Sequence, residues 1–354
     1  MRTLSLIFML LLFTGCTAGG TAVSTPTDMD MDTAVPPTPS STPIPPSPTP
    51  AAAPITAANA ASLQSDDPLS VPRPYKMLWS ADGQTLLLGN DDGLHTIASD
   101  GRGEIALTRT QTLSGTLDFA RDGTLIVLQD ANAIQVYAPG SLELRQTIPF
   151  SGTATSAQIS PDGRQLAVTS ADNIAATLYD LSTGQPTATL TGFNTAAPVY
   201  GVEFDPDWQT AIWVARATVQ LMDVSSGEWG ARFEHEDFVG ALALSPDGRI
   251  LATAVSATID GQFTPIVKLW DAQTGGEVGV LPQPTIVSSL AFSPDGSLLA
   301  AGNIEGNILF WDVPQQAQVA ALNDHVEQVR QLAFSPDGRI LAAADGELHL
   351  WHAP

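Results

Sequence analysis

Short apolar runs alternate with polar turns along this chain, from about residue 75 to its end. The clearest examples are residues 292–300 and 334–342, where Ser-Pro-Asp-Gly separates two apolar runs. Apolar runs of this length between turn residues are typical of β-strands. Proline presets φ, aspartate bonds to its own backbone and glycine accepts the last dihedral, so we expect a tight chain reversal at each Asp-Gly.

The turn recurs at intervals of roughly 40 residues along the chain. Its aspartates are Asp82, Asp122, Asp162, Asp207, Asp247, Asp295 and Asp337. A period of this length, built from strands and turns, is the signature of a propeller blade. We therefore predict an all-β fold, a seven-bladed β-propeller of four-stranded antiparallel sheets.

Trp-Asp pairs close the third strand of two units, at Trp270 and Trp311, and the last unit has Trp351. His235 and His325 each lie four residues before a Val and ten before the turn Ser. With these features, residues 75–354 resemble the WD40-repeat family. The resemblance implies a structural role for these residues in a buried His–Ser–Asp–Trp hydrogen-bond set, and a rigid disc that binds other proteins.

No unit supplies the whole hydrogen-bond set of that family. The last unit offers His325, Asp345 and Trp351, but Ala343 occupies the place of the Ser. We therefore expect the rigidity of the blades to come mostly from apolar packing. Ser-Pro-Asp-Gly repeats also occur in periplasmic propellers similar to the Tol-system protein, but the Trp-Asp strands favour the WD40 interpretation.

The last residues, 348–354, supply only a third strand to the final sheet. An unpaired sheet edge invites pairing with another segment. The stretch around residues 55–68 is the candidate, and the resemblance implies such closure between the two ends of the chain. We therefore assign residues 55–354 to the propeller.

The first 15 residues have the pattern of a lipoprotein-type signal peptide. Arg2 precedes the apolar run 4–13, and Thr14-Gly15 precedes Cys16, the single cysteine of the chain. This arrangement resembles a bacterial lipobox, so we expect Cys16 to carry acyl chains such as palmitate. Residues 16–54 form a Pro/Thr/Ser-rich linker that cannot bury a core and is predicted to be disordered. We expect a protein of the bacterial cell envelope, lipid-anchored and facing outside the cytoplasm.

Charge excludes one class of partner. The chain has 14 Lys and Arg against 37 Asp and Glu, with a net charge of −23. Binding to a nucleic-acid backbone requires clustered cations, which this sequence lacks. We expect no nucleic-acid partner and no electrostatic adhesion to anionic lipid.

Catalytic motifs are missing from the sequence, so we expect no enzyme activity, no cofactor and no metal site. His349 and His352 lie three apart on a predicted strand and would point to opposite faces. One alternative stays open: a central-channel site that binds a small ligand or metal, or catalyses a reaction. It would require inward-facing polar residues with perturbed ionisation.

Two lengthened segments are candidates for contact with a protein or peptide partner. Residues 256–264 add a loop between a second and a third strand, and residues 191–198 are lengthened as well. The resemblance places both segments on one face of the disc. Exposed aromatic residues often anchor protein interfaces. The candidate contact residues are Phe193, Ile259, Asp260 and Phe263.

Overall fold

The computed structural model describes residues 53–354 apart from short interior segments. These segments are 66, 72–73, 75, 91–92, 100–105, 110–116, 121–123, 130–132, 139–142, 151–153, 171–174, 193–198, 206, 260–261 and 324–326. Residues 50–354 form one compact unit. Cys16, the signal peptide and nearly all of the linker lie outside the described residues.

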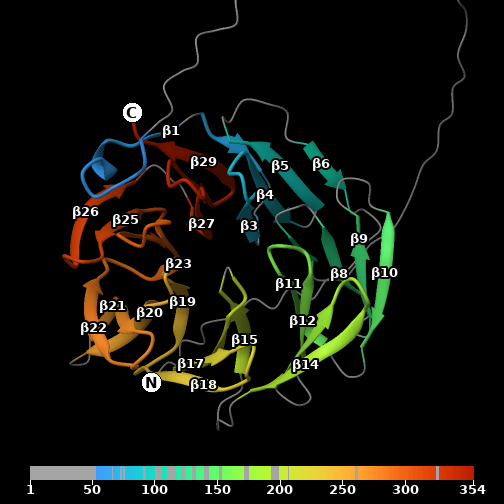
Figure 1. Cartoon of the computed structure of the whole chain (residues 1–354). Helices are drawn as coiled ribbons and strands as arrows, with labels where there is room; N and C mark the ends of the chain where they lie inside the picture. The colour runs from blue at the N-terminus through green and yellow to red at the C-terminus, as the bar shows by residue number, and fades with distance from the viewer. Residues whose placement is uncertain are drawn as a thin grey trace, which may run out of the picture. The chain divides into compact units, whose positions relative to one another are not determined.

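The described chain is a ring of antiparallel sheets (Figure 1). Six sheets contain four consecutive strands each, and their spatial order follows the chain. The first is β3 (Lys76–Trp79), β4 (Thr85–Asn90), β5 (Gly93–Ala98) and β6 (Ala106–Arg109). The second is β7 (Leu117–Phe119), β8 (Leu125–Gln129), β9 (Ala133–Tyr137) and β10 (Leu144–Pro149). The third is β11 (Ala154–Ile159), β12 (Gln165–Ser170), β13 (Ala175–Asp180) and β14 (Gln185–Thr191).

Three more sheets continue the ring. The fourth is β15 (Val199–Phe204), β16 (Thr210–Ala215), β17 (Thr218–Asp223) and β18 (Trp229–Glu234). The fifth is β19 (Val239–Leu244), β20 (Ile250–Ile259), β21 (Gln262–Asp271) and β22 (Glu277–Pro282). The sixth is β23 (Val287–Phe292), β24 (Leu298–Asn303), β25 (Ile308–Asp312) and β26 (Ala317–Leu322). The first strand of each sheet lies toward the centre of the ring (Figure 1).

The remaining sheet joins the two ends of the described chain. It contains β27 (Gln331–Phe334), β28 (Ile340–Ala344), β29 (Glu347–His352), β1 (Gln64–Ser65) and β2 (Leu69–Ser70). We call it the closing sheet. The prediction of an all-β propeller of antiparallel sheets is confirmed, but four strands per sheet is wrong here. The closing sheet has five strands because the N-terminal segment pairs with β29 twice, through two short strands.

The Ser-Pro-Asp-Gly turns form because each side chain supplies a missing backbone partner. In the closing sheet, the Ser335 hydroxyl donates to Asp337 Oδ1 at 2.7 Å. The Asp337 carboxylate accepts the Arg339 N–H at 3.1 Å, and Ser335 Oγ accepts the Ile340 N–H at 3.0 Å. Gly338 has a φ of 72°, a left-handed conformation that glycine tolerates without steric cost.

Neighbouring sheets pack face to face through small and branched side chains. Between the fifth and sixth sheets, Ala252 and Ala254 of β20 belong to one buried cluster with Leu299 and Ala301 of β24. Alanine in second strands allows two sheets to approach closely. Each sheet therefore buries its faces only against its neighbours, which is the packing rule of repeat architectures.

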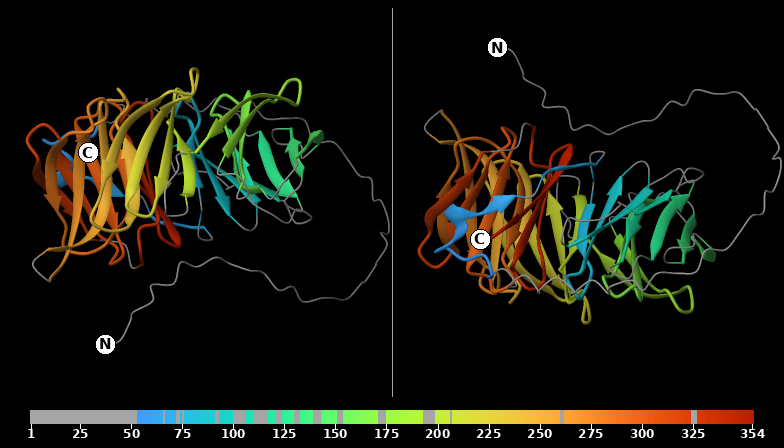
Figure 2. Two further views of the ribbon diagram at one scale, coloured as in Figure 1. Left: turned by 90° about the horizontal axis from the view of Figure 1, so that it is seen from below. Right: turned by 90° about the horizontal axis from the view of Figure 1, so that it is seen from above.

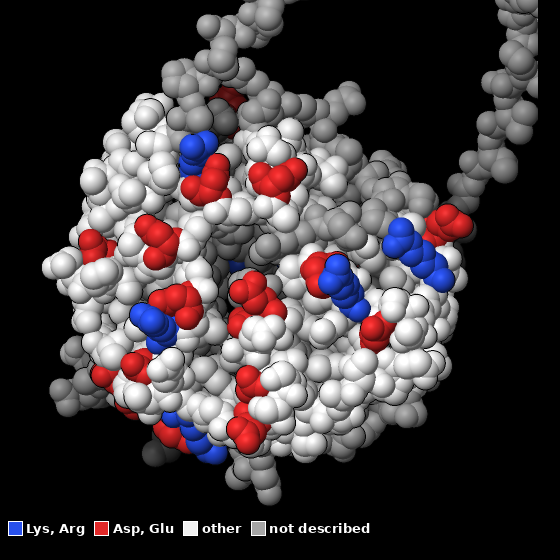
Figure 3. Space-filling model, viewed as in Figure 1, with Lys and Arg blue, Asp and Glu red and all other residues white. Residues whose placement is uncertain are grey.

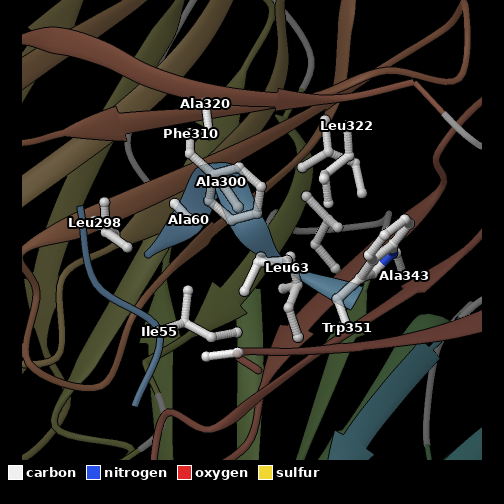
Figure 4. Close-up of a cluster of buried hydrophobic side chains, with 14 of the residues drawn as sticks. Ile55, Ala60, Leu63, Leu298, Ala300, Phe310, Ala320, Leu322, Ala343 and Trp351 are labelled. Carbon is white, nitrogen blue, oxygen red and sulfur yellow. The ribbon is translucent and has the colours of Figure 1, made fainter. Parts of the chain in front are cut away.

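The N-terminal segment closes the ring by pairing and by packing. Gln64 and Ser65 pair with His352 and Trp351, and the Ile55 N–H donates to the Gly338 carbonyl at 2.8 Å. The 3₁₀ helix η1 (Ala60–Ser62) lies against β26. Figure 4 shows the cluster that results, whose labelled members are Ile55, Ala60, Leu63, Leu298, Ala300, Phe310, Ala320, Leu322, Ala343 and Trp351. The segment therefore joins the sixth sheet to the closing sheet.

We predict that Leu63→Ala destabilises the propeller by about 2–5 kcal/mol, because truncating a buried leucine leaves a cavity. Leu63 is 9% exposed within the closure cluster. The matched control is Leu144→Ala on the outer strand β10, where the leucine is 48% exposed. Denaturant unfolding of both variants measures the difference. Equal midpoints would show that the segment contributes little to closure.

Candidate functional site

The fifth sheet contains a buried hydrogen-bond network of the WD type. His235 Nε2 lies 2.9 Å from Thr253 Oγ1, and the Trp270 indole N–H donates to the same oxygen at 2.9 Å. His235 Nδ1 lies 3.2 Å from the Ala217 carbonyl, so we assign the ring proton to Nδ1 and let the threonine donate to Nε2. Desolvation of the buried ring lowers the pKa of His235, which keeps the imidazole neutral.

Thr253 is the member of this network that the sequence analysis missed. It stands on β20, and its side chain is fully buried. A hydroxyl is what the position requires, and threonine supplies one as well as serine does. The sequence feature that could have identified Thr253 is its hydroxyl, two positions after Leu251. Leu251 is the residue that pairs with Trp270. The network of the fifth sheet therefore contains His, a hydroxyl and Trp.

The other two tryptophan positions differ in their surroundings. Trp311 Nε1 is buried without a hydrogen-bond partner among the described residues, and Ala301 stands where the fifth sheet has Thr253. Trp351 and Asp345 are buried in the closing sheet, where Asp345 accepts the N–H groups of Gly346 and Glu347 at 2.8 and 2.9 Å. His325 lies outside the described residues.

The segment predicted as a protruding loop is a β-ribbon. β20 and β21 have ten residues each, and their pairing continues past the sheet to Ser256↔Pro265, Thr258↔Phe263 and Ile259↔Gln262. The expectation of a loop over residues 256–264 is corrected to a paired ribbon, because backbone pairing continues to Ile259↔Gln262. Figure 2 shows this ribbon extending beyond its sheet, at the left of both views.

The ribbon carries the most exposed large apolar side chain among the described residues. Phe263 is 58% exposed, and Ile304, on the turn between β24 and β25 of the next sheet, is 42% exposed. The β20–β21 and β24–β25 turns lie at the same end of their sheets, so the two side chains share one face. Ile259 is described only as part of β20, and Phe193 and Asp260 lie outside the described residues.

The inner strands give the central channel two unlike walls. One position on each first strand differs around the ring: the residue two places before the turn to the second strand. It is polar or large in the first four sheets and alanine in the other three. These residues are Leu78, Asp118, Gln158, Glu203, Ala243, Ala291 and Ala333. Lys76 pairs with buried Asp118, whose other oxygen accepts the Ile159 N–H at 2.8 Å. Gln158 donates to the Val202 carbonyl.

Glu203 is the carboxylate of this wall without a partner among the described residues. Its side chain is exposed, and it stands on the inner strand β15. Desolvation by the neighbouring protein atoms raises the pKa of the Glu203 carboxyl. Among the described residues, Glu203 is therefore an inner-strand acid with perturbed ionisation, which is one part of what the channel alternative requires.

Metal-binding side chains and membrane-spanning helices are two remaining kinds of feature in the described part of the chain. No group of three or more His, Cys, Asp and Glu side chains could hold a metal ion there. Within the same residues, no helix has the length and apolar character needed to cross a membrane.

The fold and the repeated tryptophan-bearing strands define the class of the chain as a repeat propeller. Residues 230–271, 275–312 and 316–352 each match the WD40 family, described as WD domain, G-beta repeat. The chain therefore contains three WD40 repeats between residues 230 and 352. Each matched repeat begins on or just before the outer strand of one sheet and ends on the third strand of the next. This offset is why the last repeat requires another segment to complete its sheet.

A stretch of 154 residues is 31% identical to an uncharacterized WD repeat-containing protein of Synechocystis sp.. The match covers 42% of this chain and 40% of that relative. The chain therefore spans less than half the length of the relative that it matches.

We predict that Thr253→Val destabilises the propeller by about 2 kcal/mol or more, because it leaves His235 Nε2 and Trp270 Nε1 buried without a partner. Thr253→Ser keeps the hydroxyl and should lose about 1 kcal/mol, the contribution of one buried methyl. Thr258→Val on the exposed ribbon is the matched control. Denaturant unfolding ranks the three variants. A serine variant as unstable as the valine variant would contradict a role for the hydroxyl.

Proposed function

We propose that this protein is a non-catalytic protein–protein interaction scaffold, held at a membrane outside the cytoplasm. One observation carries the proposal: a paired β-ribbon presents Phe263 to solvent, on the face that also carries the exposed Ile304. A paired ribbon restricts its own backbone before any partner binds. Binding at Phe263 therefore costs less backbone conformational entropy than it would on an irregular loop. Aromatic side chains are also frequent hot spots of interfaces.

The architecture of the propeller supports this role. We count the closing sheet as the seventh blade, because the six four-stranded sheets and the closing sheet follow one another around the ring. Propellers of the WD40 family commonly present their rims and faces to other proteins, and three repeats here match that family. The face that carries the ribbon is therefore the proposed partner face.

The membrane tether is proposed from the sequence. The apolar run 4–13 followed by Thr14-Gly15-Cys16 supports export and acylation of Cys16. Two or more acyl chains anchor a protein firmly, since each buried CH₂ contributes about 0.8 kcal/mol. Residues 16–54 would then act as a spacer of on the order of 100 Å if fully extended. The resemblance to a lipobox supports an anchor in a bacterial envelope.

We predict that Cys16→Ser moves the protein from the membrane fraction to the soluble extracytoplasmic fraction. Serine cannot form the thioether on which acylation depends, whereas export needs only the signal region. Fractionation with metabolic labelling by an alkyne fatty acid measures both effects. Ser5→Ala, inside the signal, is the control and should keep the label. Label that persists in the serine variant would contradict acylation at Cys16.

A second function is favoured by the inner wall of the channel. Glu203 faces the channel without a described partner, and Lys76 and Asp118 lie on the same wall. Such a wall could bind a small ligand or take part in catalysis. No set of groups with a defined reaction geometry accompanies these residues in the described chain, so the scaffold proposal stands first.

We predict that Phe263→Ala abolishes or strongly reduces capture of a specific partner. A hot-spot aromatic typically contributes about 2 kcal/mol or more to binding, which is a loss of affinity of roughly thirtyfold. In-cell crosslinking with quantitative mass spectrometry measures capture. Val278→Ala is the matched control, since Val278 is 44% exposed on β22 of the same sheet, away from the ribbon tip.

The control variant should capture the partner as the natural chain does. A partner captured equally by the Phe263 variant would bind another surface of the molecule. If no partner were captured reproducibly, the channel alternative would be favoured. Ligand screening would then compare the natural chain with the Glu203→Gln variant.

A further inference from the structure

A hollow of about 470 Å³ lies between the fifth and sixth sheets. Its lining comes from the end of β22 and the residues after it, and from β25, β26 and the residues that flank them. Four of the lining side chains are carboxamides, those of Gln283, Asn307, Gln318 and Asn323. The others are apolar. The hollow has the size that ligand sites commonly have, about 300–1,000 Å³.

The hollow lies at the base of the β20–β21 ribbon. The Gln283 N–H donates to the Pro265 carbonyl at 3.1 Å, and Pro265 pairs with Ser256 where the ribbon leaves its sheet. On the sixth sheet, Asn307 directly precedes β25, at the end of the turn that carries Ile304. The hollow therefore belongs to the proposed partner face, the end of the sheets that presents Phe263 and Ile304 to solvent.

Gln283 is the buried carboxamide of this lining, at 8% exposure. Its Nε2 donates to the Leu281 carbonyl at 3.3 Å. A carbonyl oxygen only accepts, so this contact assigns the amide nitrogen to the side of Leu281 and the amide oxygen to the other side. Gln283 Oε1 is buried and has no hydrogen-bond partner among the described residues. Buried amide oxygens nearly always have a partner, so this one requires a donor from outside the described chain.

The other three carboxamides of the lining are also uncommitted. The side chains of Asn307, Gln318 and Asn323 make no hydrogen bond to any described residue. Asn303, in the same turn as Ile304, shows the contrast, because its Oδ1 accepts two backbone N–H groups of that turn at 2.9 and 3.0 Å. A carboxamide has donors and an acceptor, so the three uncommitted groups can pair with either kind of atom in a ligand.

The lining selects a neutral ligand. Carboxylates are spread over the face of the molecule in Figure 3, whereas no residue that lines this hollow is ionisable. A charged group would lose water here and gain no counter-charge from the lining, which is unfavourable. A neutral amide supplies an N–H for Gln283 Oε1 and a carbonyl for a neighbouring carboxamide. A peptide joins such an amide to apolar side chains that can cover Phe263 and Ile304, which a neutral sugar lacks.

We propose that this hollow receives the uncharged carboxamide of an asparagine or glutamine side chain in a peptide segment of the partner. Gln283 Oε1 is closed to solvent in the free chain, so its amide turns toward the hollow as the peptide enters. The turn breaks one long hydrogen bond, at 3.3 Å, and pairs an oxygen that otherwise has no partner. Because the hollow belongs to the partner face, this inference rests on the scaffold function proposed above.

The test starts with a random heptapeptide library displayed on phage and selected on the full chain, purified in detergent. Enriched peptides are then synthesised, and fluorescence polarisation measures their affinity. We expect enriched sequences to contain an asparagine or glutamine close to an apolar residue. Replacing that residue of the peptide by aspartate or glutamate keeps its shape and adds a charge, so it should weaken binding at least tenfold.

Variants of the chain assign the binding to the hollow. Gln283→Met keeps the length of the side chain and removes its amide, so it should weaken peptide binding about fivefold, as expected for loss of one neutral hydrogen bond. The same variant should unfold at an equal or higher denaturant concentration, because no unpaired buried oxygen is left. Gln273→Met is the matched control and should change neither property, since Gln273 is exposed in the β21–β22 turn at the other end of the fifth sheet.

Three results would overturn the carboxamide site. They are a selection that enriches no peptide, equal binding of peptides that carry the acidic replacement, and a folded Gln283→Met variant that binds as tightly as the natural chain. Peptides that lose affinity for the Phe263→Ala variant but not for Gln283→Met would leave the scaffold function standing and remove only this site. Binding of neutral oligosaccharides on a glycan array, without any enriched peptide, would assign the hollow to sugars and would likewise contradict the proposal.

Discussion

Closure of the ring is the constraint on which the rest of this structure depends. A single four-stranded sheet cannot bury both of its faces, so each one relies on two neighbours. The closing sheet would lack an outer strand if β29 were its last member. β1 and β2 pair with β29 and remove that exposed edge, and Leu63 with Ile55 fills the space beside Phe310 and Trp351. The free energy of unfolding of the whole propeller therefore depends on a segment that precedes its first sheet in the chain.

Different parts of the ring hold their sheets together by different means. From the fifth sheet onward, small residues such as Ala254 and Ala301 let apolar faces meet closely. In the first four sheets, hydrogen bonds cross between inner strands, from Ile159 to Asp118 and from Gln158 to the Val202 carbonyl. Buried Asp118 is compatible with its surroundings because Lys76 and two backbone N–H groups satisfy it. The polar wall of the channel thus has a structural role, and Glu203 is its exception.

The sequence predicts the repeated parts of this fold well because they rest on local chemistry. A Ser-Pro-Asp-Gly turn contains all of its own hydrogen-bond partners, so Asp247 and Asp337 could be placed without knowledge of the rest of the chain. Features that depend on distant residues were harder. Thr253 acquires its role only beside His235 and Trp270, which come from other strands, and the division of residues 64–70 into two strands depends on β29.

The candidate site was predicted in part. Phe263 was expected to be exposed and is, but Ile304 escaped notice because its turn has ordinary length and only the neighbouring ribbon gives it significance. The ribbon itself looked like a loop, since Gly261 and Pro265 are poor strand residues by propensity. Pairing between Thr258 and Phe263 outweighs that propensity, as tertiary context commonly does in sheets.

Repetition makes departures informative in a chain of this kind. In five turns the aspartate accepts a hydrogen bond from the serine of the same turn. The structure of the turn therefore explains those aspartates. The fourth sheet meets the same requirement with Asp205 and then adds an exposed carboxylate and a strained indole that the turn does not need. Burial of the Trp208 indole, which is 8% exposed in one apolar cluster with Trp213 and Met222, offsets the backbone strain. The tryptophan at the turn is therefore explained by apolar packing between the third and fourth sheets, as Asp205 is explained by the backbone of its own turn.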